Sequence, residues 1–147
     1  MPTTKDQLIP YLHKYFMTAS LMAQDFDRHL SDTREHKFSD AAEDGMMFLV
    51  SKAGLKMAQW YGSLYVVVEG WHEIGMSDPE VDQLLKSPNT KLLKGVRNSV
   101  FHFQKNWLDD RLAKFFASKD SIAWVRALTE ALRRVLIAEM RRISRKP

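Results

Sequence analysis

Apolar residues recur at intervals of three and four along most of this chain, which is the spacing of one face of an α-helix. The first such stretch runs from about Lys5 to Leu30. Because Pro10 lies in its early turns, we expect the regular helix to start or to kink there. A second stretch runs from Ala41 to about Ile74, with Ser39 or Asp40 as its N-cap. The apolar positions of the first stretch are Leu8, Leu12, Tyr15, Phe16, Ala19, Met22, Phe26 and Leu30.

The rest of the chain predicts shorter elements and one more long helix. The segment "GMSDPEVDQLLKSPNT" combines Gly, Ser, Asp and two prolines, so we expect a loop with at most a short helix from Pro79 to Lys86. A third helix follows from Thr90 to about Gln104. After a connection and the short segment "LAKFFAS", a last helix opens near Asp120 or Ser121. No stretch alternates apolar and polar residues as a β-strand would. The pattern therefore predicts an all-α antiparallel bundle of four to five helices.

Composition narrows the class of protein. A chain of 147 residues with 45% hydrophobic residues is long enough for one core, and we expect residues 1–147 to form a single domain. Cysteine is absent, which excludes disulfides and thiolate metal sites. The longest apolar runs, "MMFLV" and "LYVVV", are far too short to span a bilayer, and the N-terminus lacks the pattern of a signal peptide. We therefore expect a cytoplasmic protein with no membrane partner.

Positive charge is concentrated at the C-terminal end. The net charge is +4, and residues 121–147 hold seven of the 22 Lys and Arg but only two of the 18 Asp and Glu. One interpretation is an RNA-binding group formed by Arg133, Arg134, Arg141 and Arg142. The alternative is a solvated basic helix end, where cations also favour the helix dipole.

The segment "KGVRNSVFHFQ", residues 94–104, carries the candidate chemistry. On a helix, Asn98 and His102 lie one turn apart on the side opposite the apolar residues, and Arg97 lies at the flank. The three polar residues could be solvated surface. However, Phe101 beside them would be unusual in water unless a helix or a second subunit covers it. The apolar face that we expect to be buried comprises Leu92, Leu93, Val96, Val100 and Phe103.

These residue types suit one reaction in particular. Histidine can take or give a proton near neutral pH, and the arginine fork can stabilise charge on a phosphoryl group. An asparagine can orient either of them. Such groups are what metal-free RNA cleavage requires, in which the 2′-hydroxyl attacks the adjacent phosphate. The chain has no glycine-rich phosphate loop.

The stretch "RNSVFH" resembles the Arg-x(4–6)-His motif of the HEPN superfamily, in its Arg-Asn-x-x-x-His form. The resemblance implies a metal-independent endoribonuclease without cofactor, with its site at a homodimer interface and a toxin–antitoxin or other defence context. It assigns phosphate stabilisation to Arg97, a supporting role to Asn98 and proton transfer to His102. RNA as substrate and an antitoxin or nucleotidyltransferase as partner also follow from it. HEPN proteins include catalytically inactive members that act in dimerisation or in partner or RNA binding, and that alternative stays open.

A second constellation is "EGWH", Glu69 to His72, which has the Glu-x-x-His spacing of di-iron helical bundles. A complete site needs a second such motif, and none occurs, so we assign no metal. We expect instead that Glu69, near the end of its helix, approaches the third helix and hydrogen-bonds Arg97 or His102.

Glycines and large aromatic residues give the remaining structural expectations. Gly45, Gly54, Gly62 and Gly70 return to a similar side of the second helix about every two turns, which would permit close packing; alternatively they are merely tolerated. The residues expected as core or interface anchors are Trp60, Tyr61, Trp71, Trp107 and Trp124.

Overall fold

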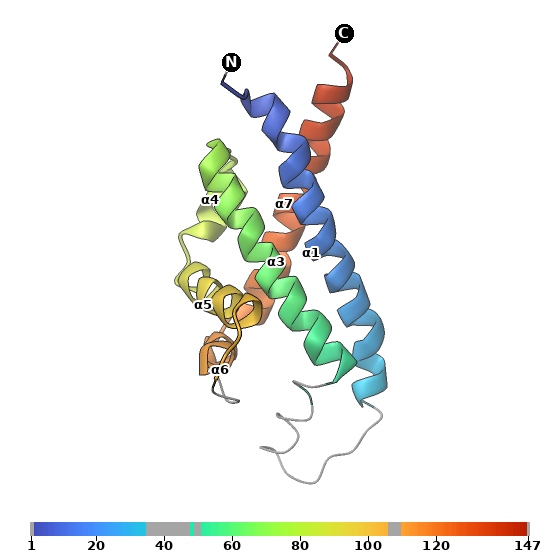
Figure 1. Ribbon diagram of the computed structural model, residues 1–147, viewed down its shortest axis with the longest axis vertical. Coiled ribbons are helices and arrows are strands. Elements are labelled where there is room, and N and C mark those ends of the chain that lie inside the picture. Colours follow the sequence, from blue (N-terminus) through green and yellow to red (C-terminus); the bar gives the residue numbers. More distant parts are fainter. Residues whose placement is uncertain (1, 35–47, 49–50, 106–109, 147) are drawn as a thin grey trace.

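The computed structural model describes residues 2–34, 48, 51–105 and 110–146, and these residues form helices and no strand. The all-helical class is therefore confirmed for this part of the chain. Six helices are described, so the expected count of four to five is not confirmed (Figure 1). The difference arises because two short segments, Pro79–Leu85 and Asp110–Ala117, are both helical. The helices are α1 (Lys5–Arg34), α3 (Lys52–Ile74), α4 (Pro79–Leu85), α5 (Asn89–Phe101), α6 (Asp110–Ala117) and α7 (Ser121–Ser144).

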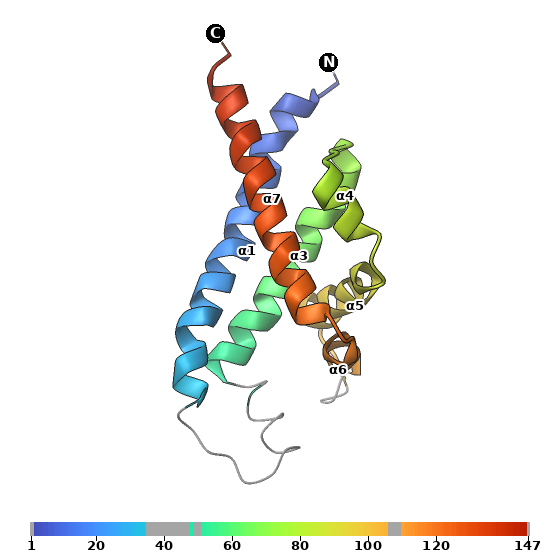
Figure 2. The ribbon, with the colours of Figure 1, turned by 180° about the vertical axis from the view of Figure 1, so that it is seen from behind.

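Three long helices, α1, α3 and α7, form the body of the molecule, and both termini lie at the same end of it (Figures 1 and 2). α1 and α3 pack along much of their lengths in opposite directions, since Leu12 approaches Gly70 while Phe26 packs on Trp60. α4, α5 and α6 lie on the side of α3 away from α1 (Figure 1). None of the described helices is both long and apolar enough to cross a membrane.

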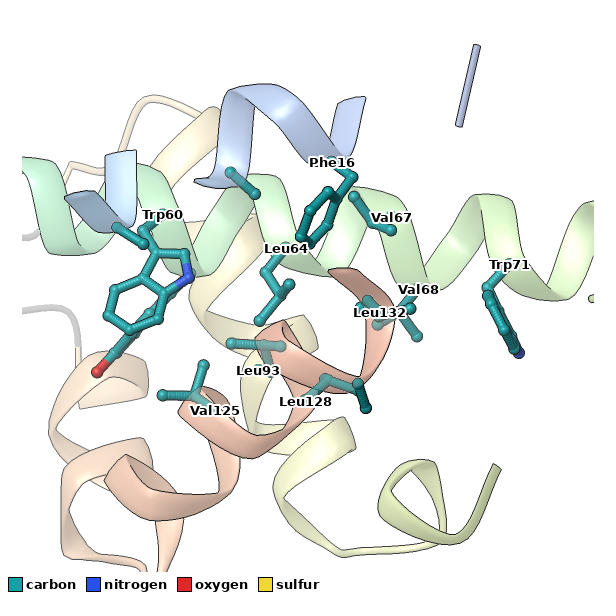
Figure 3. Close-up of a cluster of buried hydrophobic side chains, with 14 of the residues drawn as sticks. Phe16, Trp60, Leu64, Val67, Val68, Trp71, Leu93, Val125, Leu128 and Leu132 are labelled. Carbon is teal, nitrogen blue, oxygen red and sulfur yellow. The ribbon is translucent and has the colours of Figure 1, made fainter. Parts of the chain in front are cut away.

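α3 is the most deeply buried element, and its interior side chains lie among those of α1, α5 and α7 (Figure 3). Trp60, Tyr61 and Trp71 are fully buried, as expected for anchors. Trp60 Nε1 donates a 3.2 Å hydrogen bond to Thr129 Oγ1 on α7, so a large apolar ring is buried without leaving its N–H unpaired. Trp124 is also buried, and Trp107 lies outside the described residues.

Capping residues set both ends of α3. Ser51 is the N-cap, and its Oγ accepts a 3.1 Å hydrogen bond from the Gly54 backbone. The expected start at Ala41 with Ser39 or Asp40 as cap is therefore wrong for α3, and residues 39–47 lie outside the described part. The helix ends at Ile74 as expected, because Gly75 takes the left-handed conformation, φ 70°, and Met76 N–H reaches back to the Trp71 carbonyl at 2.9 Å.

α1 differs from expectation at two positions. It begins at Lys5, so the expected start at Pro10 is wrong, whereas the alternative, a kink at Pro10 in the second turn, stays a prediction. Tyr15, expected in the buried stripe, is exposed, because the residues that face the core are Leu12, Phe16 and Ala19. The close approach expected at the glycines is present at Gly70, where an added Cβ would lie 2.7 Å from Leu12 Cδ1.

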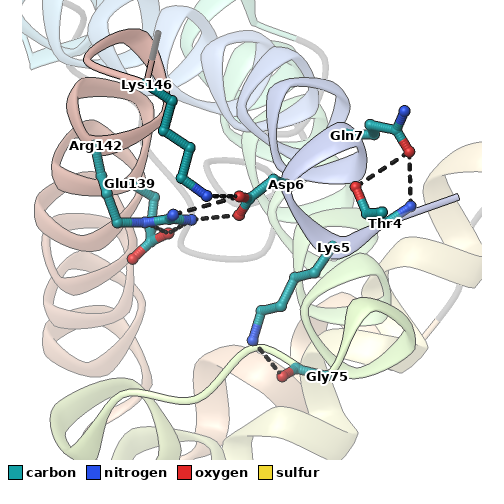
Figure 4. A network of polar contacts seen from close by, with 8 residues as sticks. All are labelled: Thr4, Lys5, Asp6, Gln7, Gly75, Glu139, Arg142 and Lys146. Carbon is teal, nitrogen blue, oxygen red and sulfur yellow. Dashed lines mark hydrogen bonds and ion pairs between the residues drawn. The ribbon is translucent and has the colours of Figure 1, made fainter.

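Charged side chains tie the first turn of α1 to both neighbouring long helices (Figure 4). Lys5 Nζ donates to the Gly75 carbonyl at the end of α3, at 2.7 Å. Asp6 accepts hydrogen bonds from Arg142 and Lys146 near the end of α7, and Arg142 also binds Glu139 at 2.7 Å. The hydrogen bonds from Arg142 and Lys146 lower the pKa of Asp6 well below its ordinary value of 3.8.

This ion-pair cluster predicts a pH dependence of stability. Because the pKa of Asp6 is lower in the folded state than in the unfolded chain, its contribution is fully present above the unfolded value of 3.8 and is lost as pH falls below it. Urea denaturation of Asp6→Asn should therefore show a smaller loss of unfolding free energy between about pH 5 and about pH 3 than the wild type shows. Equal losses in the two proteins would contradict this role for Asp6.

Two glycine substitutions should change stability in opposite directions. Gly75→Ala should lower the unfolding free energy by about 1 kcal/mol, because nothing crowds the site and only the left-handed backbone opposes a side chain. Gly95→Ala, inside α5, should raise it by roughly 0.5 kcal/mol, because the added Cβ meets Arg111 at an ordinary 3.6 Å and strengthens the helix. Chemical denaturation measures both, and a stabilising Gly75→Ala would show that the backbone conformation is not strained for alanine.

Candidate functional site

The candidate site lies at the C-terminal end of α5, which rests on α3. Leu93 and Val96 are buried as expected, and Leu92 and Val100 pack partly buried against the core. The ring of Phe101 lies over Gly62 of α3, where an added Cβ would approach Phe101 Cζ to 3.2 Å. Gly62 thus lets the end of α5 come close to α3, and Phe101 stays 43% exposed on its outer side.

α5 is shorter than its apolar pattern predicts. It ends at Phe101, and His102 takes an extended conformation with φ −120° and ψ 135°. The side chain of Gln104 supplies hydrogen bonds that a further helical turn would otherwise make. Its Nε2 donates to the carbonyl oxygens of Asn98 at 3.3 Å and His102 at 2.8 Å. Phe103, expected on the buried face, is 93% exposed, since helical spacing no longer applies beyond Phe101.

Arg97 is held by two neighbours. Its Nη2 lies 3.0 Å from Glu69 Oε2 on α3, and its Nη1 donates to Asn98 Oδ1 at 2.9 Å. The expected contact of Glu69 with the third helix is thus present. The side chains of Arg97 and Glu69 are 27% and 37% exposed, so this ion pair is partly shielded from solvent. Arg97 Nε is buried without a hydrogen-bond partner in the described part of the chain.

His102 stands apart from this pair. It is exposed and lies just beyond the end of the helix, and the expected contact between Asn98 and His102 stays a prediction. The Asn98 side chain turns to Arg97. The imidazole of His102 has no hydrogen-bond or ion-pair partner among the residues described.

Tyr65, Gln104 and Arg111 take part in this region although the sequence did not single them out. Tyr65 lies one turn before Glu69 on α3, and burial together with the Glu69 charge raises its pKa. Arg111 Nη2 donates to Gln104 Oε1 at 2.9 Å and so links α6 to the end of α5. The one-turn spacing to Glu69 could have indicated Tyr65, whereas no sequence pattern identifies a side chain that caps a helix from outside it.

Of the arginines expected to bind RNA, Arg133 and Arg134 lie in the middle of α7 and Arg141 and Arg142 in its last turn. α7 runs toward the end of the molecule that holds the termini, whereas α5 lies nearer the other end (Figures 1 and 2). Three of these arginines are in ion pairs. Arg133 lies 3.3 Å from Glu130, Arg134 lies 2.8 Å from Asp78, and Arg142 lies 2.5 Å from Asp6. Only Arg141 is exposed without a partner in the described residues, so RNA contact by this group stays a prediction.

No cluster of three or more His, Asp or Glu side chains suited to a metal ion occurs within the described ranges. The carboxylate of Glu69, the first residue of the Glu-x-x-His pair, forms an ion pair with Arg97. Comparisons of the chain with protein-family models, with curated proteins and with solved structures give no match.

The Arg97–Glu69 pair should contribute measurable coupling to stability. In a double-mutant cycle with Glu69→Gln and Arg97→Gln, we expect a coupling free energy of about 0.5–1 kcal/mol, because the pair is partly shielded. The matched control is the more exposed pair Lys114–Asp110, at 2.9 Å, whose cycle should give a smaller coupling. A coupling at Arg97–Glu69 no larger than in the control would show that the contact does not fix α5 on α3.

Proposed function

We propose that this protein is a metal-independent endoribonuclease of the HEPN type, and that Arg97, Asn98 and His102 form its active site. The observation that carries the proposal is the geometry at the end of α5. Arg97 is fixed in place by Glu69 and Asn98, while His102, five residues on, is exposed and free of partners among the described residues. A positioned cation and an accessible imidazole are the groups that cleavage at a phosphodiester requires.

In the proposed reaction the 2′-oxygen of a ribose attacks the adjacent phosphorus, and the bond from phosphorus to the 5′-oxygen breaks. His102 takes the 2′-hydroxyl proton or supplies a proton to the leaving 5′-oxygen. The Arg97 guanidinium stabilises the additional negative charge on the phosphoryl oxygens, and Asn98 orients the guanidinium through its Oδ1. The products are a 2′,3′-cyclic phosphate and a 5′-hydroxyl.

We propose that a second copy of the chain completes this site. One histidine cannot act at the same moment as the base at the 2′-oxygen and the acid at the 5′-oxygen, and a two-fold symmetric pair supplies two. Phe103 is 93% exposed and Phe101 is 43% exposed, and both flank His102. A symmetric contact through these rings would remove apolar surface from water and would place two copies of His102 near one another.

One observation favours the alternative, an inactive HEPN-like protein that dimerises or binds a partner or RNA. Both terminal nitrogens of Arg97 are used within the chain, by Glu69 and by Asn98. A phosphate would have to compete with Glu69 for the guanidinium. An antitoxin that covered His102 and the two phenylalanines would fit either function.

The experiment that tests the proposal measures cleavage of an unstructured RNA in the presence of a chelator. Wild-type protein should cleave, and His102→Ala should be slower by about 100-fold or more, because proton transfer typically contributes that much. His72→Ala is the matched control, since His72 is also exposed but lies on α3 outside the proposed site, and it should keep wild-type activity.

Equal rates for the wild type and His102→Ala would contradict the catalytic assignment and would point to a contaminating nuclease. A folded wild-type dimer that leaves the RNA intact would favour the inactive alternative.

A further inference from the structure

A groove of about 280 Å³ lies between α1 and α3, next to the proposed active site. Glu69, the partner of Arg97, is one of the residues that line it. The floor includes Leu12 and Gly70, and the missing side chain at Gly70 is what lets Leu12 approach α3 so closely. The groove is thus fixed by the packing of two long helices and does not depend on a loop.

The walls of this groove combine aromatic rings with carboxylates. Tyr11 and Tyr15, one turn apart on α1, are 65% and 55% exposed although both are large aromatic residues. Glu69 and Glu73, one turn apart on α3, supply two carboxylates. Glu73 has no hydrogen-bond or ion-pair partner in the described part of the chain. Leu8, Val66 and Ile74 complete the apolar lining.

The charge of the groove decides which ligands it can accept. No lysine, arginine or histidine is among the described residues that line it. Carboxylates repel phosphate, whereas they attract ammonium and guanidinium groups, and tyrosine rings attract the same cations through their faces. The apolar lining suits a hydrocarbon stem.

We propose that the groove between α1 and α3 binds an organic cation with a hydrocarbon stem, an alkylammonium or alkylguanidinium group, through Glu69, Glu73, Tyr11 and Tyr15. A free polyamine and a lysine or arginine side chain of a basic peptide share this chemistry. Glu73 is the main anchor, because its carboxylate is unpaired in the described residues, while Glu69 is shared with Arg97.

The shared carboxylate of Glu69 links the groove to Arg97. A bound cation and Arg97 would interact with the same carboxylate, so each weakens the interaction of the other with Glu69. Removal of Arg97 should therefore strengthen cation binding, and removal of Glu73 should weaken it. These opposite effects do not require ribonuclease activity, so the inference can fail or succeed independently of the proposed function.

Isothermal titration calorimetry with spermidine and with the peptide acetyl-Ala-Leu-Arg-Leu-Ala-amide tests the proposal. At least one of the two probes should bind, and which one binds identifies the source of the cation. For that probe, Glu73→Gln should weaken binding about fivefold, and Arg97→Gln should strengthen it by about two- to threefold. Glu130→Gln on α7 is the matched control, because it removes the same charge outside the groove, and it should bind like the wild type.

Three results would overturn the proposal. The first is no binding of either cation, and the second is unchanged binding by Glu73→Gln. The third is equal or tighter binding of an uncharged probe of similar size, hexanol, or of adenosine monophosphate, which would make the groove an apolar site or a nucleotide site. Glu73 is exposed, so Glu73→Gln should fold normally, and its thermal unfolding midpoint verifies this.

Discussion

The burial of α3 is the constraint on which the rest of the structure depends. Residues Trp60 to Leu64 are all buried, and five consecutive positions cover more than one full helical turn. A turn that is buried on all sides needs neighbours around it, and α1, α5, α6 and α7 supply them. Outside this turn α3 does reach the surface, and one such place holds Glu69 and Glu73.

This constraint also explains how the candidate site is arranged. Glu69 emerges from α3 at its partly exposed margin, between α1 and α5, so one carboxylate serves both Arg97 and the groove. α5 packs on α3 through Leu93 and Val96 in the core and through Phe101 over Gly62, and His102 follows just beyond this contact. An arginine held by two partners and an exposed histidine therefore lie near one helix end, and they are the basis of the functional proposal.

The sequence predicted the elements whose burial follows simple periodicity, and it failed where distant side chains decide the local structure. α7 and the end of α3 lie where the spacing and Gly75 indicated. Periodicity placed Phe103 in the core because it could not anticipate that the Gln104 side chain would end α5.

Ion pairs, too, could be predicted from the sequence only in part. The contact of Glu69 with Arg97 was predicted because Glu69 is a polar position near the end of its helix, from which it could reach the third helix. The pairing of Arg142 with Asp6 and of Arg134 with Asp78 joins residues far apart in the sequence. Such partners become visible only when the fold is known, so an apparently free basic cluster proved to be largely paired within the chain.

The chemistry of the RNA ends tests the central claim most directly. Purified wild-type protein is incubated with a defined RNA in chelator, and the product termini are identified by mass spectrometry. The account predicts 2′,3′-cyclic phosphate and 5′-hydroxyl termini, because the attacking group is the ribose 2′-oxygen assisted by His102 and Arg97. Products with 3′-hydroxyl and 5′-phosphate termini would contradict it, since they require attack by water and a different arrangement of groups.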